Sequence, residues 1–494
     1  MKKFYITTPL YYVNASPHIG HSYTNSAADA LARYYRRVIG KENVWFLTGT
    51  DEHGQKMQKA ADEAKLPPQA FADKMVLQFK DLWKVLDISY DDFIRTTEER
   101  HKKTVQRVLE ILYKKGDIYQ DTYEGLYCTP CETFWLESQV VGGLCPDCKR
   151  PVEKITEVNY FFRLSAYQDW LIDYIEKNPL FVKPDIRRNE VLSFLKLNKL
   201  TDLCISRPKE RLSWGIPLPF SSGHVAYVWF DALTNYISAV GEFDKEGRYK
   251  SKWWPADVQL IGKDILRQHA VYWPIMLRAL DIEPPKTVFA HGWWMVGEDK
   301  MSKSRGNVVS PIDMVNKFGV DVYRYFLLRD TPFGLDGNFS EEAVIRRFNS
   351  DLANDLGNLV YRTLTMIEKY FGEKVPSSKF QVLSSREKLV EEMNSLSARV
   401  GKCLETPDFS AALEEIWKII NMANKYVEET KPWNLAKENK TRELETFIRL
   451  LVDVIREVAR NIAPFMPQTA ESILQQIGAD TIKKGKPLFP RIEI

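Results

Sequence analysis

Apolar and polar positions follow two different periods along the first fifty residues. Residues 4–7 form a short apolar run typical of a β-strand, which we expect Pro9 to end. From Pro17 onward, apolar side chains recur at the spacing of one helix face as far as Tyr35. Residues 43–47 form a second β-prone run. A strand, a helix and a strand in this order predict βαβ units and a parallel sheet.

The character of the chain changes at about Gly116 and again at about residue 206. Between these points cysteines, glycines and short apolar runs come first, and helical patterns resume near Tyr167. Strand-and-helix character then returns with three apolar runs, at residues 225–230, 258–261 and 287–290. We therefore expect an α/β, Rossmann-type nucleotide-binding domain with a parallel sheet, split by an insertion.

From about Asp351 onward almost every window has helical period and glycine is scarce, which predicts an α-helical bundle. The sequence thus predicts five segments, which are residues 1–115, 116–206, 207–293, 294–350 and 351–494. The first and third are the two halves of the parallel-sheet domain, and the second is the insertion. The fourth contains a basic loop, and the fifth is the bundle.

Composition and charge describe an ordinary globular protein of several domains. A chain of 494 residues is too long for one hydrophobic core. Its 69 basic and 66 acidic residues leave a net charge of +3, so a nucleic-acid-binding surface must be a local patch. No signal-peptide pattern follows Met1, and no window approaches the roughly 18 apolar residues of a membrane span. We expect a cytoplasmic protein.

Four of the six cysteines form two CxxC pairs. This spacing is typical of a closed, tetrahedral Zn²⁺ site with a structural role, one per chain, and reduced thiols or an adventitious disulfide are the alternatives. The predicted ligands are Cys128, Cys131, Cys145 and Cys148. Cys204 and Cys403 are isolated, so the pattern does not indicate a secreted disulfide framework.

The tetrapeptide His18-Ile19-Gly20-His21 falls between the first predicted strand and the first predicted helix. In a doubly wound sheet, ligands bind at the carboxyl ends of strands, where this turn must lie. Two imidazoles beside the amides of a helix start suit a phosphate, and Gly20 lets the backbone approach a nucleotide closely. Taken alone the signal is weak, because such histidines also occur by chance or as a helix cap.

A second candidate, Lys300-Met301-Ser302-Lys303-Ser304, describes a basic loop with small hydroxyl side chains. Its ammonium groups can stabilise the charge that builds on departing pyrophosphate, although for this motif alone an ordinary exposed basic loop is the favoured interpretation. Together, HxGH after the first strand and KMSKS after the last βα element resemble the double signature of class I aminoacyl-tRNA synthetases.

Residues 9–17, residues 227–236 and the cysteine-bearing insertion resemble the methionyl members of that class, and the resemblance covers the whole chain. It implies two steps. Methionine and ATP, with Mg²⁺, give methionyl-adenylate and pyrophosphate, and methionine then passes to the 3′-terminal adenosine of initiator and elongator tRNA(Met). The resemblance implies that the helical segment binds the anticodon.

The resemblance also assigns site residues, position by position. The catalytic residues are His18, His21, Lys300 and Lys303. The ATP-binding residues are these four with Gly20 and Ser302. The methionine-binding residues are Leu10, Tyr12, Asp51, Trp229, Ala232, Tyr236 and His269.

The chemical groups of methionine fit the methionine-binding residues that the resemblance assigns. Asp51 offers a carboxylate to the substrate ammonium, and a thioether packs well against aromatic rings. Core packing is the alternative for the aromatics. Gln268 and Leu233 depart from residues found in some relatives, and Arg207 is a further candidate for a phosphate contact.

In the helical segment, Asn354, Asn358 and Arg362 step by four along one predicted helix face. Amides and a guanidinium in such a row can hydrogen-bond to unpaired bases, and Trp433 offers a ring for stacking. The resemblance assigns Asn358, Arg362 and Trp433 to the anticodon. A solvated helix face, and a tryptophan packed between helices, are the alternatives.

Three other interpretations are weighed against this one. Leucyl, isoleucyl and valyl enzymes carry far larger insertions, and cysteinyl enzymes place a cysteine before HxGH, where this chain has Tyr11-Tyr12-Val13. A small-molecule nucleotidyltransferase does not need the helical bundle. A zinc-ribbon RNA-binding protein leaves the KMSKS loop unexplained. Because no appended OB-fold is recognised, a monomer, a piece of a longer protein and a partner of a separate OB-fold tRNA-binding subunit all stay open.

Overall fold

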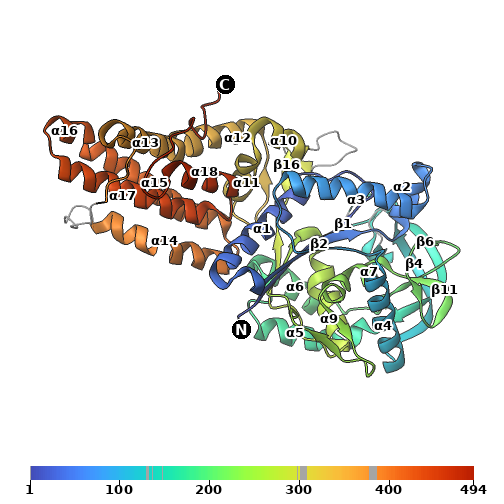
Figure 1. Ribbon diagram of the computed structural model, residues 1–494. Coiled ribbons are helices and arrows are strands. Elements are labelled where there is room, and N and C mark those ends of the chain that lie inside the picture. Colours follow the sequence, from blue (N-terminus) through green and yellow to red (C-terminus); the bar gives the residue numbers. More distant parts are fainter. Residues whose placement is uncertain are drawn as a thin grey trace. The chain divides into compact units, whose positions relative to one another are not determined.

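The computed structural model describes residues 2–129, 133–135, 137–146, 148–296, 299–300, 309–377 and 387–493. It divides into two compact units, drawn along the chain from blue to red in Figure 1. The first unit consists of Met1–Ala28, Tyr35–Lys84 and Ile88–His291. The second consists of Asp29–Tyr34, Val85–Asp87 and Gly292–Ile494.

A six-stranded sheet with the order β3-β2-β1-β14-β15-β7 forms the centre of the first unit. All its pairings are parallel, which confirms the predicted sheet. The strands are β1 Phe4–Tyr12, β2 Val44–Asp51, β3 Asp92–Arg95, β7 Val182–Lys183, β14 Val258–Gly262 and β15 Val288–His291. The strand order reverses beside β1, and such a reversal is where doubly wound sheets bind ligands.

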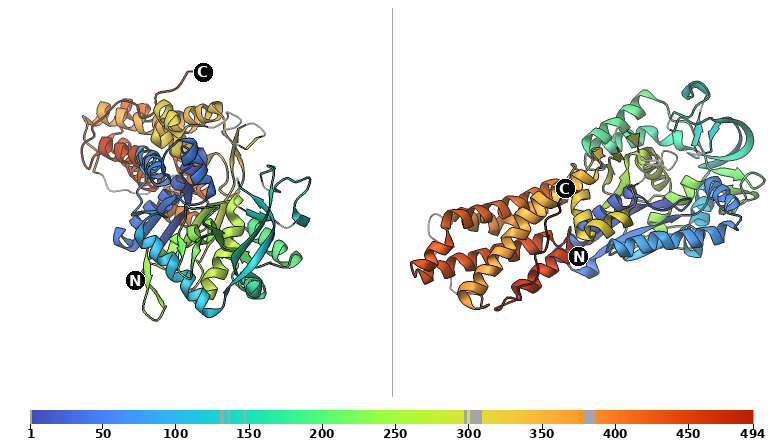
Figure 2. Two further views of the ribbon diagram at one scale, coloured as in Figure 1. Left: turned by 90° about the vertical axis from the view of Figure 1, so that its right-hand side faces the viewer. Right: turned by 90° about the horizontal axis from the view of Figure 1, so that it is seen from above.

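Helices lie on both faces of this sheet (Figure 2). The helices of this part of the chain are α1 Ile19–Ile39, α2 Gln55–Glu63, α3 Pro68–Val85, α4 Glu99–Lys115, α7 Val228–Leu233, α8 Asn235–Ser238 and α9 Trp273–Ala279. All four residues of β15 are buried, as expected for a strand covered on both faces.

The first strand does not end at Pro9, so that prediction was wrong. β1 continues to Tyr12, and its pairing with β2 shifts register between Thr7 and Leu10. Proline has no N–H to donate to the ladder, and an irregularity at this point lets the strand pass through it. The strand therefore delivers Leu10 and Tyr12 to the carboxyl edge of the sheet.

The apolar run at 225–230 is also not a single element. Strand β11, Ser221–Ala226, ends the β structure, and α7 begins two residues later at Val228. β11 pairs in a separate antiparallel sheet with β9 Ser206–Pro208 and β10 Pro217–Leu218. A short apolar run cannot distinguish a buried strand from a buried helix, which explains the error.

The span 116–206 contains an antiparallel four-stranded sheet of its own, with the order β5-β4-β6-β8. Its elements are β4 Ile118–Cys128, β5 Thr133–Trp135, β6 Glu153–Phe162 and β8 Leu203–Cys204, with helices α5 Gln168–Lys177 and α6 Asp185–Leu197. The same span also supplies β7, which pairs with β15 at the edge of the parallel sheet. The insertion is therefore continuous with the main sheet through one short strand. A hairpin, β12 Gly241–Phe243 and β13 Tyr249–Ser251, follows α8.

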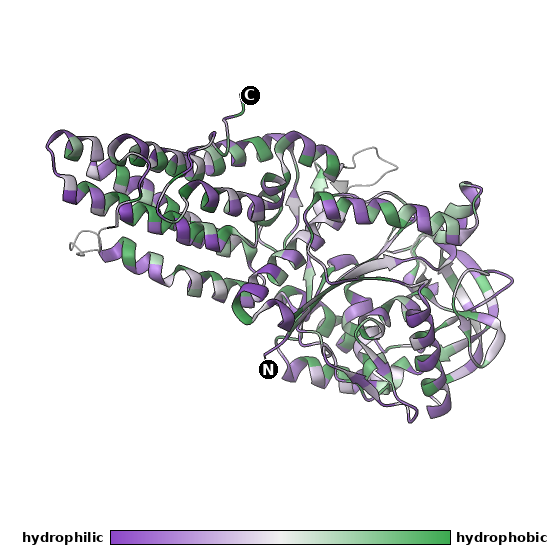
Figure 3. Cartoon of the chain, in the orientation of Figure 1, coloured by the Kyte–Doolittle hydropathy of each residue, from purple (hydrophilic) through white to green (hydrophobic). Residues whose placement is uncertain are grey.

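The second unit is mainly helical, which confirms the predicted bundle. Its helices are α10 Pro311–Phe318, α11 Val320–Arg329, α12 Glu341–Arg347, α13 Asn358–Phe371, α14 Glu387–Glu405, α15 Phe409–Thr430, α16 Pro432–Lys437, α17 Thr441–Ile462 and α18 Pro467–Ile477. A small sheet joins β16 Trp294–Val296 to β17 Asp299–Lys300 and β18 Gly337–Asn338. Hydrophilic and hydrophobic residues alternate along the bundle helices in Figure 3, as in amphipathic helices. Over the described ranges, no helix combines the length and apolarity that crossing a membrane requires.

A fully buried ion pair lies within the second unit. Arg324 of α11 and Asp29 both have completely buried side chains, with 2.7 Å between Nη2 and Oδ2. The same guanidinium donates hydrogen bonds to the carbonyl oxygens of Leu86, Pro464 and Phe465. The carboxylate of Asp29 thus balances the charge of Arg324, and three backbone carbonyl oxygens accept hydrogen bonds from the same guanidinium. The same Asp29 oxygen also accepts from Arg33 Nε at 2.7 Å.

Candidate active site and metal centre

The HxGH turn follows β1 and forms the start of α1. His18 is the N-cap, and its Nδ1 accepts a hydrogen bond from the Gly20 N–H at 3.1 Å. In return, His21 Nδ1 accepts from the His18 N–H at 3.0 Å. The two rings stack with 3.9 Å between centroids. The alternative of a helix cap is thus confirmed, and the arrangement is a capping box built from two histidines.

This cap has a chemical consequence. Because both Nδ1 atoms accept, each neutral ring carries its proton on Nε2. A Cβ on Gly20 would lie 3.0 Å from Cε1 of His18, so glycine leaves space for that ring. Two ring donors at a helix N-terminus suit a bound phosphate.

The predicted pyrophosphate-binding loop is only partly described. Asp299 and Lys300 form β17, where Lys300 pairs with Met295. Ser302 and Lys303 lie outside the described residues. Their roles therefore stay predictions from the sequence.

Three predicted methionine-binding residues share the carboxyl edge of the parallel sheet. Leu10 and Tyr12 end β1, and Asp51 ends β2 directly opposite Tyr12. Asp51 is buried, whereas Leu10 and Tyr12 are half-buried. The ammonium of Lys56 lies 5.0 Å from the centroid of the Tyr12 ring.

Three further predicted residues meet as an aromatic wall, which consists of Trp229, Tyr236 and His269. Trp229 comes from α7, Tyr236 from α8, and His269 from the π-helical turn Gln268–Tyr272. The ring centroids of Trp229 and Tyr236 lie 6.5 and 5.7 Å from that of His269, both edge to face. Ala232 is buried on α7.

Hydrogen bonding fixes the state of His269. Its Nδ1 lies 2.9 Å from the carbonyl oxygen of Ile265, and its Nε2 lies 2.7 Å from the Tyr236 hydroxyl. A carbonyl only accepts, so Nδ1 donates to Ile265 and Nε2 accepts from Tyr236. Burial lowers the pKa of His269 to about 4, and it raises the pKa of Tyr236 well above its ordinary value. The aromatic wall is therefore uncharged at neutral pH.

Three other residues singled out from the sequence are Leu233, Gln268 and Arg207. Leu233 is buried in the core at the end of α7, and Gln268 is half-buried at the start of its π-helical turn. Arg207 is buried, and its guanidinium carbon lies 4.1 Å from the centroid of the Tyr127 ring.

One buried group around a carboxylate was not predicted from the sequence. It is the Asp231 cluster, which consists of Asp231, His53, His101 and Ser238. Asp231 Oδ2 lies 2.7 Å from His53 Nδ1, and Oδ1 lies 2.7 Å from His101 Nε2. His101 Nδ1 lies 2.8 Å from Ser238 Oγ. Burial acts to raise the pKa of Asp231, but the two histidines outweigh it and hold that pKa below its ordinary value. The only available signal was the position of Asp231 and His53 inside segments already assigned to the pocket.

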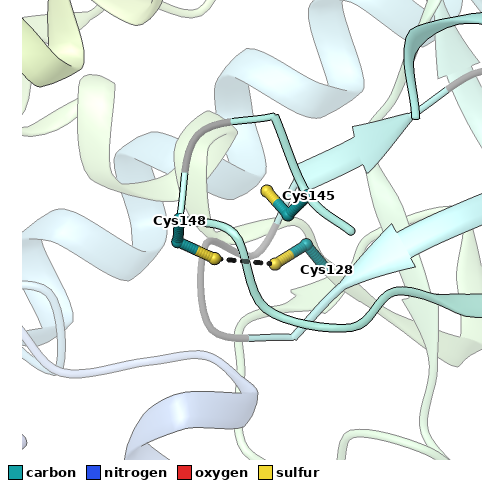
Figure 4. A group of neighbouring side chains, drawn as sticks. All are labelled: Cys128, Cys145 and Cys148. Carbon is teal, nitrogen blue, oxygen red and sulfur yellow. Dashed lines mark hydrogen bonds between the residues drawn. The ribbon is translucent and has the colours of Figure 1, made fainter. Parts of the chain in front are cut away.

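Three predicted metal ligands come together in the insertion, as Figure 4 shows. The sulfur atoms of Cys128, Cys145 and Cys148 all lie within 4.8 Å of one another. Cys128 and Cys148 are 3.5 Å apart, far beyond the ~2.05 Å of a disulfide and close to the ~3.8 Å between thiolates on one tetrahedral zinc. The donor set fits Zn²⁺. The fourth predicted ligand, Cys131, lies outside the described residues.

The predicted anticodon-binding residues lie in the second unit. The π-helical segment Phe348–Gly357 leads directly into α13, so Asn354 and Asn358 stand on either side of a change in helix type, and both are exposed. Arg362 Nη1 lies 2.6 Å from the carboxylate of Glu428 on α15. The side chain of Trp433, near the start of α16, is 39% exposed, so packing between helices does not account for it fully.

Comparisons with known proteins agree over the whole chain. The family model described as "tRNA synthetases class I (M)" matches residues 4–156 and 149–364, and the model "Anticodon-binding domain of tRNA ligase" matches residues 387–490. A methionine–tRNA ligase of Caldanaerobacter subterraneus is 50% identical over 100% of this chain and 79% of its own length. One from Clostridium acetobutylicum is 49% identical with the same coverage.

A solved structure shows the same fold. Mycobacterium tuberculosis methionyl-tRNA synthetase in complex with methionyl-adenylate is 40% identical, with a TM-score of 0.94 over 99% of this chain and 100% of that one. The match extends over the parallel-sheet domain, the insertion and the helical bundle of this chain. The chain therefore belongs to the methionyl-tRNA synthetases, a family of class I aminoacyl-tRNA synthetases.

Proposed function

We propose that this protein activates L-methionine with ATP and transfers it to the 3′-terminal adenosine of tRNA(Met). The observation that carries the proposal is the uncharged aromatic wall in a chain 50% identical to a methionine–tRNA ligase. A thioether is soft and packs well against aromatic rings, and an uncharged wall costs no desolvation of an ion. Asp51, with Leu10 and Tyr12 at the sheet edge, provides a carboxylate for the substrate ammonium.

In the first step, the methionine carboxylate oxygen attacks the α-phosphorus of ATP, and the bond to the β-phosphate oxygen breaks to release pyrophosphate. The Nε2 donors of His18 and His21 lie at the N-terminus of α1, where they stabilise the negative charge of the phosphates. This chemistry depends on positioning and charge stabilisation and needs no nucleophile from the protein. Mg²⁺ on the ATP neutralises phosphate charge, and Lys300 and Lys303, with Ser302, stabilise the leaving pyrophosphate.

In the second step, a ribose hydroxyl of the terminal adenosine attacks the activated carbonyl, and AMP leaves. Asn358, Arg362 and Trp433 bind the anticodon in the second unit. A cytoplasmic location and a separate OB-fold partner stay predictions from the sequence.

The tRNA-binding part of this function is tested by Trp433→Ala. We expect kcat/KM for tRNA charging to fall about 5–150-fold, because stacking on one base contributes about 1–3 kcal/mol. Methionine-dependent ATP–pyrophosphate exchange, which needs no tRNA, should keep its wild-type rate. Leu474→Ala is the matched control, since Leu474 on α18 is a similarly exposed apolar side chain, at 42%. Unchanged charging by the Trp433 variant would remove Trp433 from the anticodon site.

Zinc is the metal that the cysteine cluster should hold, and its role is structural because four thiolates leave no open position. We expect one zinc per chain by metal analysis of the purified protein. Cys148→Ser should weaken zinc binding by more than about 100-fold, since loss of even an outer-shell partner costs 10–100-fold. Cys403→Ser, outside the cluster, should keep its zinc. Zinc retained at full occupancy by the Cys148 variant would contradict the assignment.

A further inference from the structure

The Asp231 cluster connects the two sides of the proposed methionine site. His53 stands two residues after Asp51, which ends β2 and faces the substrate ammonium. Asp231 lies on α7, between Trp229 and Ala232. The 2.7 Å hydrogen bond from His53 to Asp231 therefore joins the strand end that binds the ammonium to the helix that binds the thioether.

Burial makes this connection rigid. The side chains of Asp231 and His101 are completely buried, and that of His53 is 5% exposed. A carboxylate only accepts, so the His53 Nδ1–H and the His101 Nε2–H both donate to Asp231. A charge-assisted hydrogen bond in a buried site is strong, and a displaced partner would leave a buried charge without compensation.

His101 fixes the other end of the arrangement. It comes from α4, and its second nitrogen meets Ser238 at the end of α8, the helix that carries Tyr236. Asp231 thus accepts one hydrogen bond from His53, just after the end of β2, and one from His101 of α4. The same His101 is hydrogen-bonded to Ser238 of α8. The three segments that supply Asp51, Trp229 and Tyr236 all meet at this cluster.

We propose that Asp231 is a positioning residue for methionine recognition. Its carboxylate, held by His53 and His101, sets the separation between the ammonium-binding Asp51 and the thioether-binding Trp229. The inference rests on the proposed methionine site. Asp231 is not proposed to contact the substrate. It acts only by holding the end of β2 and helix α7 together.

The test measures methionine and ATP KM values in pyrophosphate exchange with Asp231→Asn. An amide has one acceptor oxygen and no negative charge, so it can accept from only one of the two ring N–H groups, and the other ring keeps its hydrogen bond only by moving its proton to its second nitrogen. We expect methionine KM to rise at least about tenfold, because misplacement of about 1 Å can cost 10²-fold. The ATP KM should stay within about twofold of wild type. None of the three hydrogen bonds that hold the cluster together involves the HxGH turn, where ATP is proposed to bind.

Two substitutions of His53 separate positioning from folding. His53→Asn keeps a donor where Nδ1 stood, and methionine KM should stay within about threefold of wild type. His53→Leu removes the donor and should raise methionine KM as far as Asp231→Asn does. His224→Gln, a histidine of β11 bonded to Ser221 and Val158, is the matched control and should leave both KM values unchanged.

Trp229→Ala distinguishes failure of this inference from failure of the proposed site. A raised methionine KM for Trp229→Ala with an unchanged one for Asp231→Asn would overturn the positioning role alone. Unchanged methionine KM for Trp229→Ala would overturn the methionine site itself. Should Asp231→Asn fail to fold, the His53 pair decides, and equal KM values for His53→Asn and His53→Leu would overturn the proposal.

Discussion

Replacing His18 with asparagine should lower the rate of methionine-dependent pyrophosphate exchange by about 10²–10³-fold, the usual cost of removing one preorganised donor. The asparagine oxygen can still accept the Gly20 N–H that His18 Nδ1 accepts, so α1 keeps its N-cap. The Nε2–H donor disappears. The substitution therefore separates the structural role of His18 from its proposed catalytic role.

The measurement combines exchange kinetics with urea unfolding. The free energy of unfolding should change by less than about 0.5 kcal/mol, as Asn is among the best N-cap residues. Asp408→Ala is the matched control for a lost cap, because Asp408 caps α15 through the Ala411 N–H at 3.0 Å. It should lose about 1 kcal/mol of stability and keep its exchange rate. An exchange rate within threefold of wild type for His18→Asn would remove His18 from catalysis.

Replacing Asp29 with asparagine should lower the free energy of unfolding of the second unit by about 3–5 kcal/mol. The side chain of Arg324 is completely buried, and Asp29 is the carboxylate that balances its charge. The three backbone carbonyls around the guanidinium would still accept hydrogen bonds, but they carry no formal charge. A buried cation without its anion is costly, whereas the intact pair contributes little net stability.

Urea unfolding followed by the circular dichroism of the helices measures this effect. Asp87→Asn is the matched control, because Asp87 pairs with Arg33 at 3.2 Å but is 44% exposed, and its loss should cost less than about 1 kcal/mol. The double variant Asp29→Leu with Arg324→Met should recover much of the lost stability. Equal losses for Asp29→Asn and Asp87→Asn would show that burial of the pair does not determine its contribution.

The parallel sheet was predictable where its strands are long and buried. β2, β14 and β15 contain the runs 44–47, 258–261 and 288–290, which are apolar except for Gln259 because both faces of the sheet are covered. β7 was not predictable, since its two residues have no period and pair with β15 only in the folded chain. The continuation of β1 through Pro9 likewise depends on a register shift against β2.

Some features of the functional site were likewise predictable from the local sequence, whereas others depend on the folded chain. HxGH could be found because four consecutive residues carry both the cap and the ring donors. The Asp231 cluster could not, because His53 and His101 are 178 and 130 residues from Asp231 in sequence. Buried hydrogen bonds over such separations follow from the fold and leave no local pattern. The neutral state of His269 also depends on burial and on the Ile265 carbonyl, which no motif reveals.

The most direct test of the central claim is ATP–pyrophosphate exchange measured with each of the twenty amino acids in turn, on zinc-loaded protein. We expect exchange with methionine, and discrimination of about 1–3 kcal/mol per methylene against the closest analogues that fit the apolar pocket. Exchange that prefers another amino acid would contradict the assignment of the aromatic wall and Asp51 to methionine. Absence of exchange with all twenty would contradict the proposed activity itself.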